Sequence, residues 1–185
     1  MRELTIDIMS LLETDEEKIV CVTTNGYVKK DGCNVMGAGI AGTMAKRFPA
    51  LPKILGECLI DSCNVPFYLM KYKNTAIWSF PTKTSYCLVK DKEDIQTKII
   101  PSWRNRVKEN SYAMGFACYS SIELISDSCK RITYMIAKRE DKSITVYIPR
   151  PGCSNGGLEW SEVKKVIEEI LVDDNYVICS KPSNN

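Results

Sequence analysis

The sequence predicts one domain of the α/β or α+β class, in which helices cover a β-sheet. Segments with the pattern of strands alternate along the chain with segments of helical periodicity, as such a sheet requires. The run KIVCVTTN at 18–25 is continuous and rich in β-branched residues, which is typical of a buried central strand. A length of 185 residues provides one full hydrophobic core and is short for two.

The first half of the chain has the patterns of several further elements. The stretch RELTIDIM alternates with period two and predicts a strand at 2–9. A helical pattern starts near Gly39, and prolines interrupt it before it resumes. In order, we expect a helix from about Gly39 to Phe48, a second short helix that ends near Ser62, and a hairpin of strands 66–72 and 75–81 that turns at Lys73–Asn74.

The second half is readable only after residue 118. Residues 84–118 mix charges, one proline and scattered aromatic residues, and show no clear period. From about Ser120 to Arg139 the apolar residues recur at helical spacing, which predicts an amphipathic helix. Beyond it we expect a strand at 143–149, a glycine-rich loop at 150–157, a helix at 158–171 and a short strand at 176–180.

The composition excludes several kinds of catalytic site. The chain has no histidine, so Ser-His and Cys-His nucleophile pairs and histidine metal ligands are absent from its sequence. None of the nine cysteines forms a CxxC pair, so no metal site is expected. Catalysis would have to use Lys, Asp, Glu, Tyr, Cys or groups of the substrate, and no cofactor is expected.

The charge and the cysteine content also indicate which partners and which cellular location to expect. The 25 basic residues nearly balance the 23 acidic ones, so any attraction for phosphate must be local. The cysteines lie mostly in apolar runs, as reduced thiols do, which favours a cytoplasmic location. The acidic, interrupted N-terminal stretch does not resemble a signal peptide, and no apolar run predicts contact with a membrane.

Two loops of small residues stand between a strand and a helix. The first contains GAGIAG at 37–42, which matches the G-x-G-x-x-G dinucleotide pattern, but a polar loop separates it from the preceding strand, and no Walker motif follows. The second is PGCSNGG at 151–157. Exposed main-chain N–H groups ahead of a helix favour phosphate, so we favour diphosphate binding over the alternative of two tight connections.

Three stretches together resemble the macrodomains, a family of ADP-ribose-binding modules. They are VTTNGYVKKDGCNVMGAGIAGTMAKRFP, WSFPTK and IPRPGCSNGGLEWSEVKKVIEEIL. The branch they resemble holds the terminal ADP-ribose protein glycohydrolase, the antitoxin that removes ADP-ribose from DNA, and small phage and bacterial proteins. The resemblance implies a three-layer α/β/α fold with a mixed, largely parallel sheet. It implies a single macrodomain over 1–185, with a family-variable insertion at about 84–118.

The resemblance also implies which residues hold the ligand. Asp7 and the main chain at Ile8 would read the adenine amino group, although an ordinary strand-end carboxylate is the alternative for Asp7. Asn25 would lie beside the distal ribose, and its alternative is a turn residue in Asn-Gly. The diphosphate and distal ribose would contact the two loops: Gly37, Ala38, Gly39, Ile40 and Ala41 in the first, and Gly152, Cys153, Ser154, Asn155, Gly156, Gly157 and Leu158 in the second.

Lys83 in FPTK corresponds to the catalytic lysine of this branch, with Asn25 orienting the ribose. Such a lysine can attack the anomeric carbon or stabilise a leaving or attacking oxygen, and partial burial would lower its pKa and make it more reactive. The alternative is a solvated lysine at a strand end. Two departures are visible: Gly156 stands where the protein-directed member has an aspartate, and YVICS lacks the aromatic residue that often stacks on adenine.

The function implied is that of an ADP-ribosyl glycohydrolase that removes ADP-ribose from nucleic acid or protein. The alternatives are a module that binds or sequesters ADP-ribose or a related nucleotide, and a phosphatase of ADP-ribose 1''-phosphate that works without histidine. Within 84–118, a basic stretch with one tryptophan could grip nucleic acid or cap the cleft, or it could be an ordinary solvated surface. Its residues are Lys98, Trp103, Arg104, Arg106 and Lys108.

Overall fold

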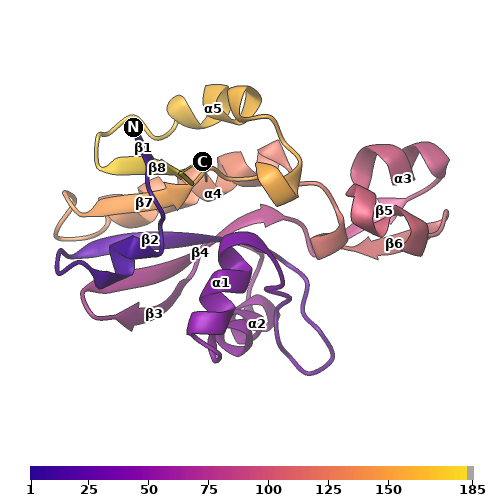
Figure 1. Cartoon of the computed structure of the whole chain (residues 1–185), viewed down its shortest axis with the longest axis horizontal. Coiled ribbons are helices and arrows are strands. Elements are labelled where there is room, and N and C mark those ends of the chain that lie inside the picture. The colour runs from indigo at the N-terminus through magenta and orange to yellow at the C-terminus, as the bar shows by residue number, and fades with distance from the viewer. Residues whose placement is uncertain (183–185) are drawn as a thin grey trace.

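The computed structural model of the chain describes residues 1–182 and is built around a six-stranded sheet (Figure 1). The order of its strands is β1-β8-β7-β2-β4-β3. All neighbours pair in parallel except β3, which is antiparallel to β4. The predicted mixed, largely parallel sheet is therefore confirmed. The strands are β1 (Arg2–Thr5), β2 (Lys18–Asn25), β3 (Tyr68–Tyr72), β4 (Thr75–Lys83), β7 (Thr145–Pro149) and β8 (Tyr176–Ser180).

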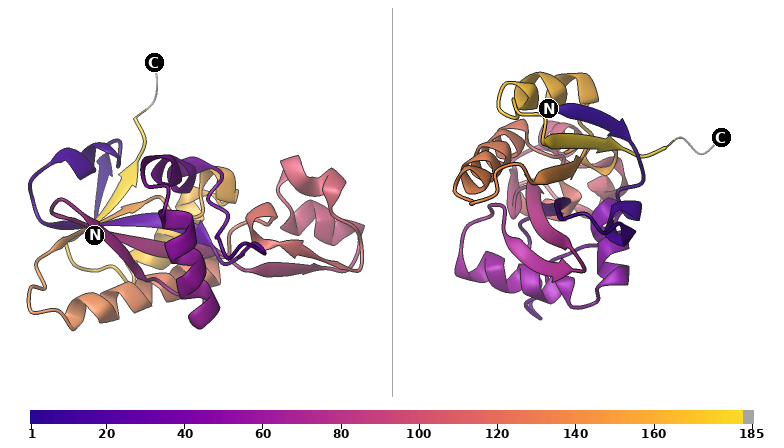
Figure 2. Two further views of the ribbon diagram at one scale, coloured as in Figure 1. Left: turned by 90° about the horizontal axis from the view of Figure 1, so that it is seen from below. Right: turned by 90° about the vertical axis from the view of Figure 1, so that its left-hand side faces the viewer.

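Helices cover both faces of the sheet and give it three layers (Figure 2). The helices α1 (Gly39–Arg47) and α2 (Leu51–Asp61) lie on one face, and α4 (Ile122–Ala137) and α5 (Trp160–Glu168) lie on the other. Alternate residues of β2 are buried in the two cores, because successive side chains of a strand point to opposite faces. This explains why the sequence of β2 is apolar without interruption.

The longest helix, α4, forms where the sequence predicted it. Ser121 caps its first turn, because the Oγ atom accepts a hydrogen bond from the N–H of Leu124 at 3.1 Å. The residues at helical spacing, among them Ile125, Cys129 and Ile132, are buried against the sheet. No helix in the described part of the chain has the length and apolar composition needed to cross a bilayer.

The first predicted strand is too long. It ends at Thr5, and the chain then turns at Asp7 into the 3₁₀ helix η1 (Ser10–Glu13). The Asp7 carboxylate accepts the N–H of Met9 at 3.0 Å, and the Asp7 carbonyl oxygen accepts the N–H of Ser10 at 2.9 Å. An aspartate whose carboxylate accepts a main-chain N–H two residues along the chain favours a turn. The alternation of apolar residues at 2–9 predicted a strand here and did not indicate this turn.

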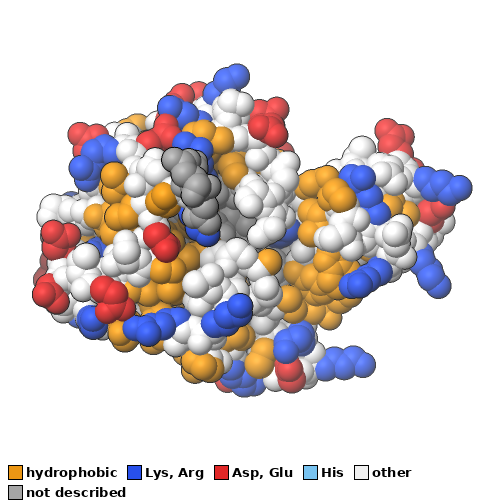
Figure 3. Space-filling model, in the orientation of Figure 1, with side chains coloured by type: hydrophobic (Ala, Val, Ile, Leu, Met, Phe, Trp, Pro, Cys, Tyr) orange, Lys and Arg blue, Asp and Glu red, His pale blue; other side chains and the backbone are white. Residues whose placement is uncertain are grey.

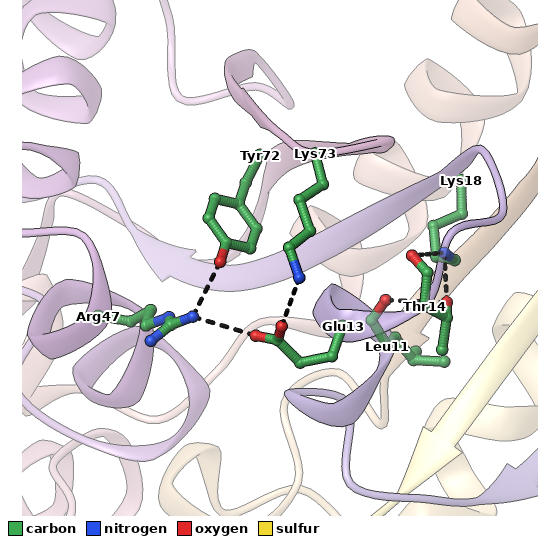
Figure 4. A network of polar contacts seen from close by, with 7 residues as sticks. All are labelled: Leu11, Glu13, Thr14, Lys18, Arg47, Tyr72 and Lys73. Atoms are coloured by element: carbon green, nitrogen blue, oxygen red, sulfur yellow. Dashed lines mark hydrogen bonds and ion pairs between the residues drawn. The ribbon is translucent and has the colours of Figure 1, made fainter.

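A network of exposed charged residues connects η1 to the β3–β4 hairpin and to α1 (Figure 4). The Glu13 carboxylate pairs with Arg47 at 3.0 Å and with Lys73 at 2.6 Å. Arg47 also donates to the hydroxyl group of Tyr72 at 2.9 Å. Lys73 has a positive φ of 49° at the predicted turn. The network is exposed, so salt screens it, and the cores hold the layers together.

Residues 84–118 form a small lobe beside the sheet (Figure 1). The lobe contains β5 (Tyr86–Val89) and β6 (Ser111–Met114), paired as an antiparallel hairpin, with α3 (Lys92–Lys98) between them in the sequence. The short helices η2 (Pro101–Arg106) and η3 (Gly115–Ala117) complete it. Four of its buried residues, Val89, Ile99, Ala113 and Cys118, make a hydrophobic cluster separate from the two main cores.

Phe80, in the centre of β4, provides a test of the core. The side chain is fully buried, and Phe80→Ala should lower the free energy of unfolding by roughly 3–5 kcal/mol, through lost burial and the cavity left behind. Ile60→Ala, which shortens an exposed side chain of α2, is the control and should change it by about 0.5 kcal/mol or less. Urea unfolding of both variants measures the difference, and equal losses would contradict the packing described.

Candidate functional site

The main cleft of the molecule lies at the carboxyl ends of the parallel strands and has a volume of about 1150 Å³. The ends of β2, β4, β7 and β8 form its floor, and the two loops of small residues and the lobe form its walls. Open α/β sheets bind ligands at this edge. Figure 3 shows the surface hollowed between the main body and the lobe, with hydrophobic side chains gathered around the hollow.

The first loop lines the cleft at the start of α1. Helix α1 begins at Gly39, and the residue before it, Ala38, provides no side-chain cap. The first N–H groups of a helix have no partner within the helix, and they carry its positive dipole end. Gly39 has a φ of 58°, which favours glycine, and a Cβ atom at Gly37 would meet nothing within 4 Å. The open space beside Gly37 belongs to the cleft, which this residue lines.

The second loop bends tightly through the 3₁₀ turn Ser154–Gly156. Positive φ angles occur at Gly152 (76°), Ser154 (57°) and Gly157 (75°). The N–H of Leu158 donates to the carbonyl oxygen of Gly152 at 3.0 Å and closes the loop at its base. The result is a compact turn beyond the end of β7, of which residues 152–156 line the cleft.

The two loops lie against each other, although more than 100 residues separate them in the sequence. A Cβ atom at Gly39 would lie 3.3 Å from Nδ2 of Asn155. The structure therefore brings the predicted loop residues together on one cleft: Gly37, Ala38, Gly39, Ile40 and Ala41 from the first loop, and Gly152, Cys153, Ser154, Asn155 and Gly156 from the second. Gly157 and Leu158 follow directly and do not line the cleft.

Packing against a distant segment explains why two positions of the second loop are glycine, and the sequence did not indicate this contact. A Cβ atom at Gly156 would lie 2.4 Å from Oγ of Ser120, and one at Gly157 would lie 2.2 Å from the ring of Tyr119. The N–H of Ser120 also donates to the carbonyl oxygen of Gly156 at 2.9 Å. These glycines thus make room for residues 119–120, which no motif in the sequence indicates.

Lys83 lies at the end of β4 and points toward the second loop. Its Nζ atom donates to the carbonyl oxygen of Asn155 at 3.0 Å. Burial lowers the pKa of Lys83, and nearby Cys118 opposes this shift only in part. No carboxylate in the described part of the chain forms an ion pair with Lys83. A half-buried lysine without an acidic partner has a larger neutral fraction than a solvated one.

Asn25 is buried at the end of β2 and lines the cleft. Its Nδ2 group donates to the carbonyl oxygen of Val35 at 2.7 Å, and its Oδ1 atom accepts the N–H of Tyr27 at 3.0 Å. The bond from Tyr27 is the contact of an Asn-Gly turn, the alternative left open by the sequence, and the bond to Val35 connects Asn25 to the segment before the first loop. An amide group has two N–H bonds, so one donor is left beyond the bond to Val35.

Asp7 and Ile8 lie on the cleft beyond the end of β1. Asp7 is exposed, and Ile8 is buried in the core between the sheet and α1. The carboxylate of Asp7 accepts one main-chain N–H, which leaves further lone pairs for a ligand. Their placement fits the predicted end of the cleft away from Lys83.

Most of the basic residues in this stretch of the lobe make contacts within the lobe itself. Lys98 pairs with Asp94 at 2.7 Å. Arg104 donates to the carbonyl oxygens of Gln96 and Ile99 at 2.7 Å and 3.1 Å. Trp103 packs edge-on against Phe116, with ring centroids 5.0 Å apart, and both line the cleft.

The five lobe residues therefore do not form one exposed basic groove. Arg106 lies over the ring of Trp103 at 4.8 Å, and Lys108 is exposed. The placement of Trp103 favours the second expectation for this segment, a wall of the cleft. In the described residues, no group of three Cys, Asp or Glu side chains could hold a metal ion.

No model of a known protein family matches the sequence, and no curated protein matches it. Solved structures do match over nearly the whole chain. The macrodomain of DarG from Thermus aquaticus has a TM-score of 0.62 and 18% identity, and covers 98% of this chain and 97% of that one. The macrodomain of DarG from Mycobacterium tuberculosis has a TM-score of 0.57 and 19% identity, with the same coverage.

A third match is DarTG of Thermosipho africanus, whose structure was solved in complex with ADP-ribose. It has a TM-score of 0.58 and 17% identity, and the match covers 91% of this chain and 39% of that longer one. The chain therefore has a macrodomain-like fold, as the sequence resemblance indicated.

Paired glycine substitutions test the packing of the second loop. Gly156→Ala should lower the free energy of unfolding by about 1–3 kcal/mol, because its Cβ atom would overlap Ser120. Gly37→Ala, with open space around it, is the control and should change stability by about 0.5 kcal/mol or less. Adding Ser120→Gly to Gly156→Ala should recover part of the loss. Thermal unfolding measures all three, and a stable Gly156→Ala variant would refute the account.

Proposed function

We propose that this protein binds ADP-ribose in the cleft, with the diphosphate between the two loops. The main observation behind the proposal is that the side chain of Asn155, in the second loop, lies next to Gly39, in the first. This contact places two loops, one of them at a helix N-terminus, side by side at the carboxyl edge of the sheet. The unpaired main-chain N–H groups at the start of the helix would donate to the phosphates there. The fold shared with DarTG, which was solved with ADP-ribose, supports the same ligand.

The two ends of the cleft suit the two ends of this ligand. Asp7, an exposed carboxylate, would accept the adenine amino group, and the apolar side chains near it would contact the base. The distal ribose would lie beside the second loop, within reach of Lys83 and of the remaining N–H of Asn25.

We further propose that the protein hydrolyses the bond between ADP-ribose and its acceptor. Neutral Lys83 would attack the anomeric carbon, and the bond to the acceptor would break with its electron pair on the acceptor, which takes up a proton. Water would then release ADP-ribose and restore the amine. The hydrogen bond to Asn155 supports this role, because it directs the lysine toward the ribose end of the second loop.

One observation favours a second candidate, a module that binds without turnover. Lys83 has no carboxylate partner in the described residues, so the proton for the leaving group would have to come from the lysine, solvent or substrate. A protein that only sequesters ADP-ribose or a related nucleotide needs the two loops and does not need an acid.

Lys83→Ala separates these candidates. Turnover of ADP-ribosylated DNA or protein should be lost almost completely, because the variant has no amine to attack the anomeric carbon. Lys71→Ala, which removes an exposed lysine of β3, is the control and should retain activity. Calorimetry with ADP-ribose follows binding in each variant. Binding without release by the unaltered protein would establish the module, and the absence of binding would refute both candidates.

The pH dependence of turnover tests the state of Lys83. Only the neutral amine is a nucleophile, so the rate should rise with pH as Lys83 loses its proton. Burial lowers the pKa of this lysine, which places the midpoint below the ordinary value of 10.5. Rates measured at saturating substrate, with ADP-ribose affinity followed over the same range, give the midpoint. A rate that falls as pH rises would contradict a neutral lysine in the reaction.

A further inference from the structure

The hairpin of the lobe leaves one face largely exposed. Side chains of the two strands alternate between faces, and Val89 and Ala113 point toward α3 and the buried cluster. The opposite face carries Tyr86 and Leu88 from β5 and Tyr112 and Met114 from β6, and we call it the hairpin face. Tyr86 is 54% exposed, Leu88 40% and Tyr112 71%. Three large side chains are thus exposed next to one another on one face of a small sheet.

We propose that the hairpin face binds a single strand of nucleic acid by stacking bases on Tyr86 and Tyr112. Leu88 and Tyr112 are direct cross-strand partners, and Tyr86 lies two residues along the same face. Aromatic side chains spread over a small sheet offer flat surfaces to successive bases, and each base can stack regardless of sequence. The proposal does not depend on turnover at Lys83.

The charge of the lobe suits this partner. Residues 84–118 contain six Lys or Arg and four Asp or Glu, so the lobe carries the net charge of +2 that the whole chain has. Asp91 caps α3 by accepting the N–H of Asp94, and Asp94 pairs with Lys98. These carboxylates are thus engaged at α3, which packs on the other face of the hairpin through Ile95.

Two exposed lysines stand at the ends of the hairpin strands and remain for phosphate contacts. Lys90 follows β5, and Lys108 precedes β6. Neither forms an ion pair in the described residues. Backbone attraction of this kind and base stacking together characterise proteins that hold single strands.

The size of the hairpin face argues against a folded protein partner or a second copy. Each strand has four residues, so the face measures roughly 14 Å by 10 Å. A stable protein interface needs about 800 Å² from each side, several times this area. A nucleic-acid strand needs no such area, because each stacked base and each phosphate contributes separately.

The hairpin face is continuous with the cleft through a row of aromatic rings. Tyr86 contacts Tyr27 edge-on at 5.4 Å, and Tyr27 contacts Phe116 at 5.3 Å. Phe116 in turn packs against Trp103, and these last two line the cleft. A strand held on the hairpin face would therefore extend toward the reaction end of the site.

Fluorescence anisotropy with labelled 12-nucleotide single-stranded DNA and RNA tests the proposal at two salt concentrations. The double variant Tyr86→Ala/Tyr112→Ala should lose about 30-fold or more in affinity. Tyr134→Ala is the matched control, since this tyrosine of α4 is 56% exposed and lies outside the lobe, and it should bind as the unaltered protein does. Binding should weaken as salt rises.

Three results would overturn the proposal. They are no binding of either oligonucleotide by the unaltered protein, equal binding by the double variant, or a dimer in sedimentation that the double variant abolishes. Affinity for ADP-ribose, measured by calorimetry, should be unchanged in the double variant, because neither tyrosine lines the cleft. Oligonucleotide binding without ADP-ribose binding would refute the proposed function and leave the hairpin face supported.

Discussion

The hydrogen bond from Lys83 to the carbonyl oxygen of Asn155 connects the parts on which the candidate site depends. Lys83 ends β4, a central strand of the sheet, and Asn155 belongs to the second loop, beyond β7. The side chain of Asn155 abuts Gly39 at the start of α1. One residue therefore relates the lysine, the second loop and the helix N-terminus. Their relative positions hold only while β2, β4 and β7 keep their parallel register, which ends all three strands at one edge.

The lobe is attached to this arrangement through residues 118–121, which pass between it and the second loop. Tyr119 accepts a hydrogen bond from Arg104 of the lobe at 3.2 Å, and its ring fills the space beside Gly157. Ser121 donates its N–H to the carbonyl oxygen of Thr82, next to Lys83. A short segment therefore connects the lobe to the end of the cleft that contains Lys83. A molecule could contact both without crossing a gap.

The cleft is lined both by the small residues of the two loops and by a few charged side chains, among them Asp7, Lys83 and Arg150. The chain is nearly neutral, and Lys83 is half-buried with a lowered pKa. Main-chain N–H groups are fixed in direction, and they lose little on binding because they are already ordered. The sequence has no histidine, so the proposed chemistry at this site cannot use an imidazole.

The sequence by itself determined the elements whose pattern is local: the buried run of β2, the period of α4, the β3–β4 hairpin and the two loops of small residues. The predicted end of β1 was wrong. The chain turns at Asp7 because its carboxylate accepts a main-chain N–H, and the apolar–polar alternation of the sequence gives no sign of this hydrogen bond. Only the tertiary structure decided that Gly39 meets Asn155, that Ser120 and Tyr119 fill the spaces beside Gly156 and Gly157, and that residues 84–118 form a lobe. These contacts join segments far apart in the chain, and they arise from strand order and packing, which no local pattern records.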